Sequence, residues 1–132
     1  MADIDYGYRR TLEGTSFDEA EERITAALKE QGFGILTEID VQKTLKKKLD
    51  VDFDRYKILG ACNPQLAHRA LQAEQFIGLV LPCNVVVTEN DSGDAVVAIL
   101  KPESMFSAVD VEGMDDLVEE ADTLLQTALE NV

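Results

Sequence analysis

The sequence predicts an α+β protein, a two-layer sandwich with helices on one face of a mixed, mainly antiparallel sheet. Short runs rich in β-branched residues alternate with longer segments whose apolar residues recur at helical spacing. Each helical segment carries a single apolar stripe, so the helices can cover only one face of the sheet. The turn sequence "NDSG" between two apolar runs indicates an antiparallel hairpin. The expected order of elements is roughly β-α-β-α-β-α-β-β-α.

The first strand and helix occupy the N-terminal part of the chain. We expect a strand at residues 6–12, followed by a helix within "TSFDEAEERITAALKEQGFG". Ser16 and Glu19 form a capping-box pair at the start of this helix, and Gly32 is placed to end it. The apolar residues that share one face of the helix are Phe17, Ala20, Ile24, Ala27 and Leu28.

A second strand and helix follow directly. "FGILTEI" has the length and composition of a short strand, and Asp40 is suited to cap the helix that comes after it. In that helix, apolar residues repeat every four positions and predict a buried stripe. They are Val41, Leu45 and Leu49.

The third strand, "RYKILGAC", leads into a helix at the dipeptide Asn63-Pro64. Asn63 is suited to cap this helix, and Pro64 fits its first position. Gly60 inside the strand predicts a bulge or the close approach of another part of the chain. The residues expected to be buried by the helix are Leu66, Ala67, Ala70 and Leu71.

The last elements are a hairpin and a long helix. "LVLPCNVVVTE" and "DAVVAILK" are predicted strands, joined by a turn in which Gly93 is placed for a positive φ. Pro82 lacks an N–H, so it should lie at the start of a strand, on an edge or at a bulge. The final helix is expected at residues 113–130. Its buried residues should be Leu117, Ala121, Leu124 and Ala128.

The valines of the hairpin predict how the molecule assembles. Val85 and Val87 alternate with Val86, so both faces of their strand are partly apolar. Because the helices cover one face only, the other face needs a partner. We therefore expect a homodimer.

Size and composition are those of an ordinary globular protein. With 132 residues, of which 45% are hydrophobic, the chain can bury a core as one domain spanning residues 1–132. No apolar run approaches the roughly 20 residues of a membrane span, and "MADIDYGYRR" lacks the apolar core of a secretory signal. We expect a cytoplasmic protein without a membrane partner.

The charge is strongly negative, with 26 Asp and Glu against 12 Lys and Arg and a net charge of −14. Such a field repels a phosphate backbone, so we expect no nucleic-acid partner. No basic residue follows Lys101, and two interpretations of this acidic region stay open: a docking surface, or a solvated surface adapted to high salt. The acidic residues around the last helix are Asp110, Glu112, Asp115, Asp116, Glu119, Glu120 and Asp122.

Three motifs carry a resemblance to a known family. "EIDVQKTLKKKL", "YKILGACNP" and "LPCNVVV" together resemble the family called domain of unknown function 302, DUF302. The resemblance covers nearly the whole chain, including "SFDEAEERITAALKEQGF" and the closing helix. It implies a compact α/β dimer without an assigned activity, so it supports the fold and leaves the function open.

Cys62 is the residue of most chemical interest. It ends a strand just before the Asn63 cap, where the amides of Gln65 and Leu66 are unpaired helix donors. Three interpretations are open: a packed thiol, a contact to a ligand or anion, and a nucleophilic thiol of lowered pKa.

Cys83 belongs to the next predicted strand. It alternates with Val85 and Val87, a pattern that directs it into the core. If the two strands are neighbours, both cysteines converge with Asn63 and Asn84 in one pocket. The expected ligand-binding residues are Cys62, Asn63, Gln65, Leu66, His68, Cys83 and Asn84.

His68 and a group of lysines complete the candidates. His68 is either a structural histidine or a base paired with Cys62. Two thiols and one imidazole fall short of the four ligands of a structural zinc, so no metal site is predicted, and no cofactor is identified. Lysines on the Asp40 helix are either a solvated face or a patch that receives an anion or an acidic surface. They are Lys43, Lys46, Lys47 and Lys48.

Two functions remain in competition. The leading hypothesis is a homodimeric binding or scaffold module without catalysis, with its ligand or anion at the corner of Cys62, Asn63 and Pro64. The alternative is a protein that handles redox equivalents, sulfur or a soft metal through Cys62 and Cys83. The two hypotheses differ in the expected pKa of Cys62, which only the second requires to be depressed.

Overall fold

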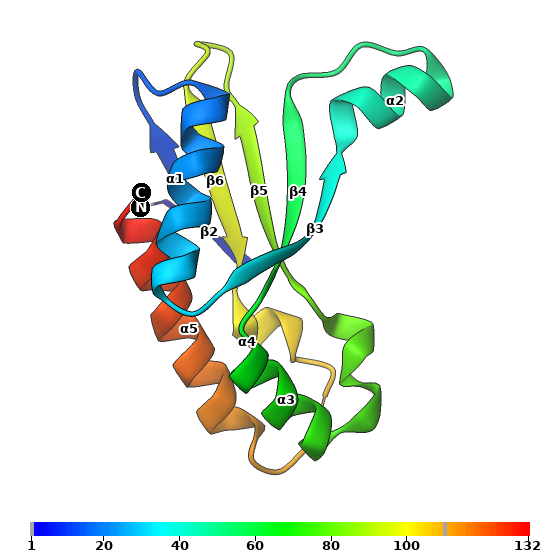
Figure 1. Cartoon of the computed structure of the whole chain (residues 1–132), viewed down its shortest axis with the longest axis vertical. Helices are drawn as coiled ribbons and strands as arrows, with labels where there is room; N and C mark the ends of the chain where they lie inside the picture. The colour runs from blue at the N-terminus through cyan, green and yellow to red at the C-terminus, as the bar shows by residue number, and fades with distance from the viewer. Residues whose placement is uncertain (1, 110) are drawn as a thin grey trace.

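A computed structural model describes residues 2–109 and 111–132, with side chains from Ile4 onward. One sheet runs through the molecule in the strand order β1-β2-β6-β5-β4-β3, and each of these neighbouring pairs is antiparallel (Figure 1). The strands are β1 (Ala2–Ile4), β2 (Gly7–Leu12), β3 (Gly34–Asp40), β4 (Tyr56–Cys62), β5 (Cys83–Glu89) and β6 (Ala95–Leu100).

Helices lie on one face of this sheet and at its two ends. The helices are α1 (Phe17–Glu30), α2 (Val41–Leu49), α3 (Pro64–Ala73), the 3₁₀ helix η1 (Gln75–Val80), α4 (Pro102–Met105) and α5 (Met114–Glu130). Figure 1 shows α1 and α5 across one face, α3, η1 and α4 at the lower end, and α2 at the upper end. The predicted α+β class is confirmed. β1, η1 and α4 were not anticipated from the sequence.

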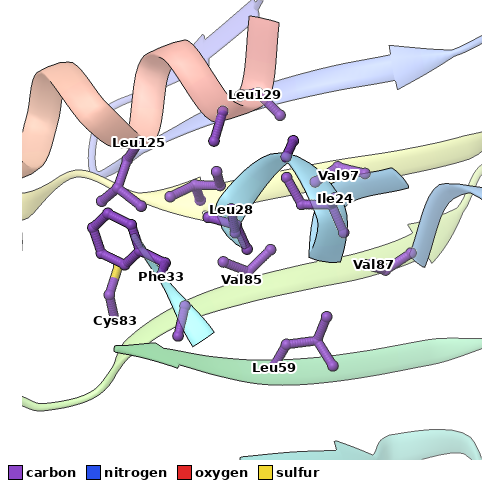
Figure 2. Close-up of a cluster of buried hydrophobic side chains, with 14 of the residues drawn as sticks. Ile24, Leu28, Phe33, Leu59, Cys83, Val85, Val87, Val97, Leu125 and Leu129 are labelled. Atoms are coloured by element: carbon purple, nitrogen blue, oxygen red, sulfur yellow. The ribbon is translucent and has the colours of Figure 1, made fainter. Parts of the chain in front are cut away.

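The main core fills the space between the sheet and the pair α1 and α5. Ile24 and Leu28 of α1 and Leu129 of α5 have no exposed surface, and they pack toward Val85 and Val97 of the sheet (Figure 2). The predicted stripe of α1 is therefore confirmed, since all five of its apolar residues are buried. In α5 the expected Leu117, Ala121 and Ala128 are buried. Leu124, which was also expected to be buried, is only partly buried, and Leu125 and Leu129 are buried instead.

Side-chain caps fix three helix starts where the sequence predicted them. Ser16 Oγ accepts the Glu19 amide at 3.2 Å and Asp40 Oδ1 accepts the Lys43 amide at 2.9 Å. Asn63 Oδ1 accepts the amide of Leu66 at 3.3 Å. These bonds satisfy backbone donors that the first helical turn leaves unpaired.

Two predicted burial patterns are wrong. No residue of α2 is buried, and Leu49, expected in its buried stripe, is 66% exposed. Leu71, expected on the inner face of α3, is 44% exposed. In both places the apolar residue has the right helical spacing, but no element of the same chain covers it.

The face of the sheet away from α1 and α5, called here the open face, is nearly free of charge. Its row Ile39, Ile58, Val86, Ala98 and Arg9 crosses five strands in register. Val85 and Val87 point to the helices and Val86 to the open face, as their alternation predicted. Its described residues include Gly7, Arg9, Thr11, Thr37, Ile39, Tyr56, Ile58, Gly60, Asn84, Val86, Thr88, Val96, Ala98 and Leu100, among which Arg9 alone is charged.

Candidate functional site

The two cysteines meet where β4 ends and β5 begins. Ala61 of β4 is paired with Cys83 of β5, so Cys62 and Cys83 occupy adjacent ends of neighbouring strands. Both thiols are free. The two strands are therefore neighbours, which the convergence of the two cysteines requires.

A small cavity of about 40 Å³ lies at this corner. Its wall is built from the end of β4, the first turns of α3, the start of β5, α4 and the middle of α5. Most of the lining is apolar, with Ala70, Phe106 and Leu117 among the buried wall residues. The volume suits a few water molecules or a small group, since one water needs about 10–15 Å³ and a benzene-sized ligand about 150 Å³.

The cavity opens to the surface on one side. Cys62, Ala67 and Met105 line it and are partly exposed, whereas Cys83 and Leu125 are buried. In Figure 2 the Cys83 side chain points toward the ring of Phe33, another wall residue. Cys62 is thus at the mouth of the cavity, and Cys83 belongs to the core, as its strand alternation predicted.

The surroundings of both thiols favour the neutral form. Burial raises the pKa of Cys83 to about 12, and partial burial raises the pKa of Cys62 above its ordinary value of 9.0. Desolvation opposes the thiolate, so the shift is in the direction opposite to the lowering expected from the helix start at this position. A nucleophilic thiol requires a shift in the opposite direction.

The Leu66 amide, which was expected to face a ligand, is used by the cap of α3. Because the Leu66 amide donates to Asn63 Oδ1, it is not available to an acceptor, which corrects our prediction. Asn63 Nδ2 donates to the Gln31 carbonyl at 3.4 Å, so this side chain is also engaged. The corner cavity therefore has the character of an apolar site.

Gln65 faces a separate, shallow surface cleft. This cleft has a volume of about 460 Å³, and Glu120 is part of its wall together with Gln65 and Leu124. The carboxylate of Glu120 opposes an anion there, although Arg69 pairs with it at 2.7 Å. The expectation of an anion at this helix start gains no support from the geometry.

The other expected site residues lie elsewhere. His68 is exposed on α3 and does not line the corner cavity, so it is not placed as a base for Cys62. Asn84 is exposed and lies on the open face, where it borders two surface hollows. In residues 2–109 and 111–132, no three His, Cys, Asp or Glu side chains gather as they would around a metal ion. Within the same ranges, no helix has the length and apolar character needed to cross a membrane.

Gly60 confirms the predicted close approach beside the site. A methyl group added at Gly60 would lie 2.7 Å from Pro82 Cγ and would overlap Thr37 Oγ1. The partner strand β3 has a register irregularity between Ile35 and Thr37. Glycine is therefore required where the Leu81-Pro82 segment, which is a cis peptide, crosses the end of β4.

Several wall residues of the cavity were not anticipated. Phe106 and Leu117 come from distant parts of the chain and carry no local signal of a site. Pro102 does carry one, because a proline after Lys101 marks a possible helix start and the structure has α4 there. Phe33 was visible only as the first residue of a predicted strand.

Comparison with known proteins places the chain in a family. The family described as domain of unknown function DUF302 matches residues 8–132. The chain belongs to this family. A crystal structure of an uncharacterized conserved DUF302 protein from Bacillus stearothermophilus is similar to it, with a TM-score of 0.87 and 28% identity over 97% of this chain and 98% of the other. No curated protein matches. The resemblance predicted from the three motifs is confirmed.

Proposed function

We propose that this DUF302 protein is a non-catalytic, homodimeric binding module that holds a small apolar group in the corner cavity. The observation that carries the proposal is a half-open apolar cavity in which Asn63 and the Leu66 amide are already hydrogen-bonded. A ligand that displaces water from such a lining is stabilised by the hydrophobic effect. The same lining offers no acid, base or nucleophile of suitable pKa for catalysis. The proposal includes a cytoplasmic location, which two unpaired cysteines favour.

The ligand is expected to be an aliphatic chain end. The cavity itself admits only a small group, but a surface groove of about 310 Å³ adjoins it and shares Leu81, Pro82 and Met105 with its wall. A chain whose end enters the cavity would continue along this groove, where Leu79 and Leu100 supply apolar surface. Affinity then comes from the apolar area removed from water.

Butan-1-ol is a suitable probe for this site. We expect its titration to shift the NMR signals of the Cys62, Leu66 and Cys83 amides in a saturable way. Ala121→Leu fills the cavity from α5 and should abolish these shifts. Ala26→Leu, the same change at an exposed position of α1, should leave them intact. Unsaturable or scattered shifts would contradict the proposed site.

The open face supports the dimer. Its described residues are apolar or uncharged apart from Arg9, in a chain with a net charge of −14, and interface cores are depleted of charge in the same way. Val86→Glu places a carboxylate in the centre of this face and should convert a dimer into a monomer in sedimentation equilibrium. Ala26→Glu, at an exposed position of α1 on the opposite side of the sheet, is the control. A wild-type monomer at micromolar concentration would refute the dimer.

The thiol-dependent alternative is tested by alkylation with iodoacetamide over a range of pH. Since the pKa of Cys62 is raised above 9.0, its thiolate fraction at neutral pH should fall below that of a free cysteine. The rate should therefore keep rising through pH 9, and Cys83 should stay unmodified in the folded protein. A plateau near neutral pH would instead favour thiol chemistry at Cys62.

A further inference from the structure

α2 and the loop after it form an apolar surface that their own chain does not cover. We call residues 41–54 the α2 wing. Leu49, Val51 and Phe53 are 66%, 43% and 45% exposed, and no residue of the helix itself is buried. In Figure 1 the wing stands off the upper end of the sheet, away from α1 and α5. A helix this short is only marginally stable without tertiary packing, so we expect another surface to pack against its apolar stripe.

A second exposed apolar surface lies at the opposite end of the sheet. We call residues 71–82 the η1 end. Leu71, Phe76 and Leu79 are 44%, 67% and 88% exposed. The η1 end forms one side of the groove that adjoins the corner cavity, so this groove lacks a cover as well.

The two surfaces carry opposite charge. α2 has four lysines, and the loop after it adds Asp50, Asp52 and Asp54, so the wing as a whole has a net charge of +1. Asp50 and Asp52 both pair with Lys46. Ile77 of the η1 end and Met114 at the start of α5 belong to one buried cluster, and Asp115 and Asp116, which follow Met114, are exposed. Both surfaces thus offer apolar area, and the lysines of α2 are complementary in charge to Glu74 of the η1 end and to the α5 carboxylates beside it.

We propose that the α2 wing of one copy packs against the η1 end of a second copy and closes the groove beside its corner cavity. The inference rests on the proposed dimer and specifies which surfaces meet. Figure 1 shows the wing at the upper right of the molecule and the η1 end at the lower right, so the two lie at opposite ends of the strands. A two-fold axis across the strands brings each wing onto the partner's η1 end and forms the contact twice.

This arrangement makes the site incomplete in a single copy. The groove shares Leu81, Pro82 and Met105 with the cavity, so a wing lying over it would add the partner's apolar side chains to the ligand's surroundings. An aliphatic ligand would then be held between two subunits, and its binding would strengthen the dimer by linkage.

Zero-length cross-linking of an isotope mixture tests the contact directly. Equal amounts of ¹⁴N- and ¹⁵N-labelled protein are mixed and treated with a carbodiimide, which joins lysines to carboxylates. We expect peptides with Lys43, Lys47 or Lys48 linked to Glu74 or to carboxylates of residues 103–120, with half of these pairs carrying mixed isotopes. Links of these lysines only within one copy, or to other regions of the second copy, would overturn the wing contact.

Charge and apolar variants separate this proposal from the dimer itself. Leu49→Asp in the wing and Leu79→Asp in the η1 end should each raise the dimer dissociation constant by about tenfold or more. Thr25→Asp, on the exposed face of α1, should not change it. Both target residues are exposed, so the fold should persist, and circular dichroism checks this.

The outcomes are distinguishable. A wild-type monomer refutes the dimer and the wing contact together. A dimer that Val86→Glu dissociates, but that Leu49→Asp and Leu79→Asp leave unchanged, retains the open-face interface and overturns the wing contact. Lys47→Glu should weaken the dimer, and adding Asp116→Lys to the same chain should restore it. Failure of this rescue, with cross-links that also miss Glu74 and residues 103–120, refutes the charge complementarity.

Discussion

α1 and α2 begin in the same way and end in different surroundings. Each starts at a side-chain cap, at Ser16 and Asp40 respectively, and each carries apolar residues at helical spacing. α1 buries five residues beneath itself, whereas α2 buries none. The spacing of apolar residues thus indicates that a helix has a face to cover, but it does not tell which chain supplies the cover.

The difference also separates two kinds of stability. α1 shares its core with α5 and the central strands of the sheet, so its side chains contribute to the free energy of unfolding of the whole molecule. α2 makes its contacts with β3 and β4, and it can open locally without exposing that core. Matched substitutions in the two helices should therefore differ in size and in the kind of measurement that detects them.

The largest difference is expected between Ile24→Ala and Leu49→Ala. Ile24 is fully buried under α1, so truncation should lower the free energy of unfolding by about 2–5 kcal/mol. Leu49 is 66% exposed, and its truncation should change the stability of a single copy by less than about 0.5 kcal/mol. Urea unfolding of both variants in the monomeric Val86→Glu background makes the comparison. Equal losses would mean that α2 is packed after all.

A second substitution tests whether the open face is loosely packed throughout. Gly60→Ala brings a methyl group into contact with Thr37 and Pro82, and it should cost about 1–3 kcal/mol by overpacking. Gly34→Ala, in the neighbouring strand, meets nothing within 4 Å and serves as the control. Thermal unfolding measures both, and a neutral Gly60→Ala would show that the Pro82 segment moves aside freely.

The helix caps provide a smaller and more diagnostic contrast. Ser16→Ala should lower global stability by about 1 kcal/mol, because the start of α1 is part of the core. Asp40→Ala should instead speed amide hydrogen exchange within α2 and leave the urea midpoint nearly unchanged. An equal shift of the midpoint in both variants would remove the distinction between global and local stability.

Salt should act in opposite directions on the body and on the wing. If the net charge of −14 is an adaptation to high ionic strength, KCl should raise the melting temperature as it screens repulsion. The same salt should weaken a dimer held partly by wing lysines and α5 carboxylates. An unchanged melting temperature between low and molar KCl would exclude salt adaptation.

Much of the fold could be predicted because its signals are local. The caps at Ser16, Asp40 and Asn63, and the positive φ of Gly93, depend on residues within one turn of each other, and the structure has each of them. The burial of α2 and of Leu71 could not be predicted, because burial depends on segments that are remote in sequence or belong to another molecule. β1 and α4 were too short to produce a periodic signal.

The candidate site was predicted only in part for the same reason. The strand alternation placed Cys83 in the core, and the "LPCN" and "GACN" motifs marked the two strand ends that meet. The direction of the pKa shift of Cys62 could not be predicted from the sequence, because desolvation depends on how many distant side chains surround the thiol. Asn63 marks this corner in the sequence because it caps α3. As the cap, it also accepts the Leu66 amide that was expected to face a ligand.

The pairing of β2 with β6 has a consequence for how the protein is made. Gly7 of β2 lies opposite Leu100 of β6, so β2 cannot pair with β6 until residues 95–100 have left the ribosome. At about 5–20 residues per second this delay is on the order of 5–20 s. Throughout that time the apolar side of α1 lacks both β6 and α5, two of the elements that cover it. The apolar side of α1 is therefore covered only after the last helix is released, and a ribosome that stalls before residue 114 leaves it without α5.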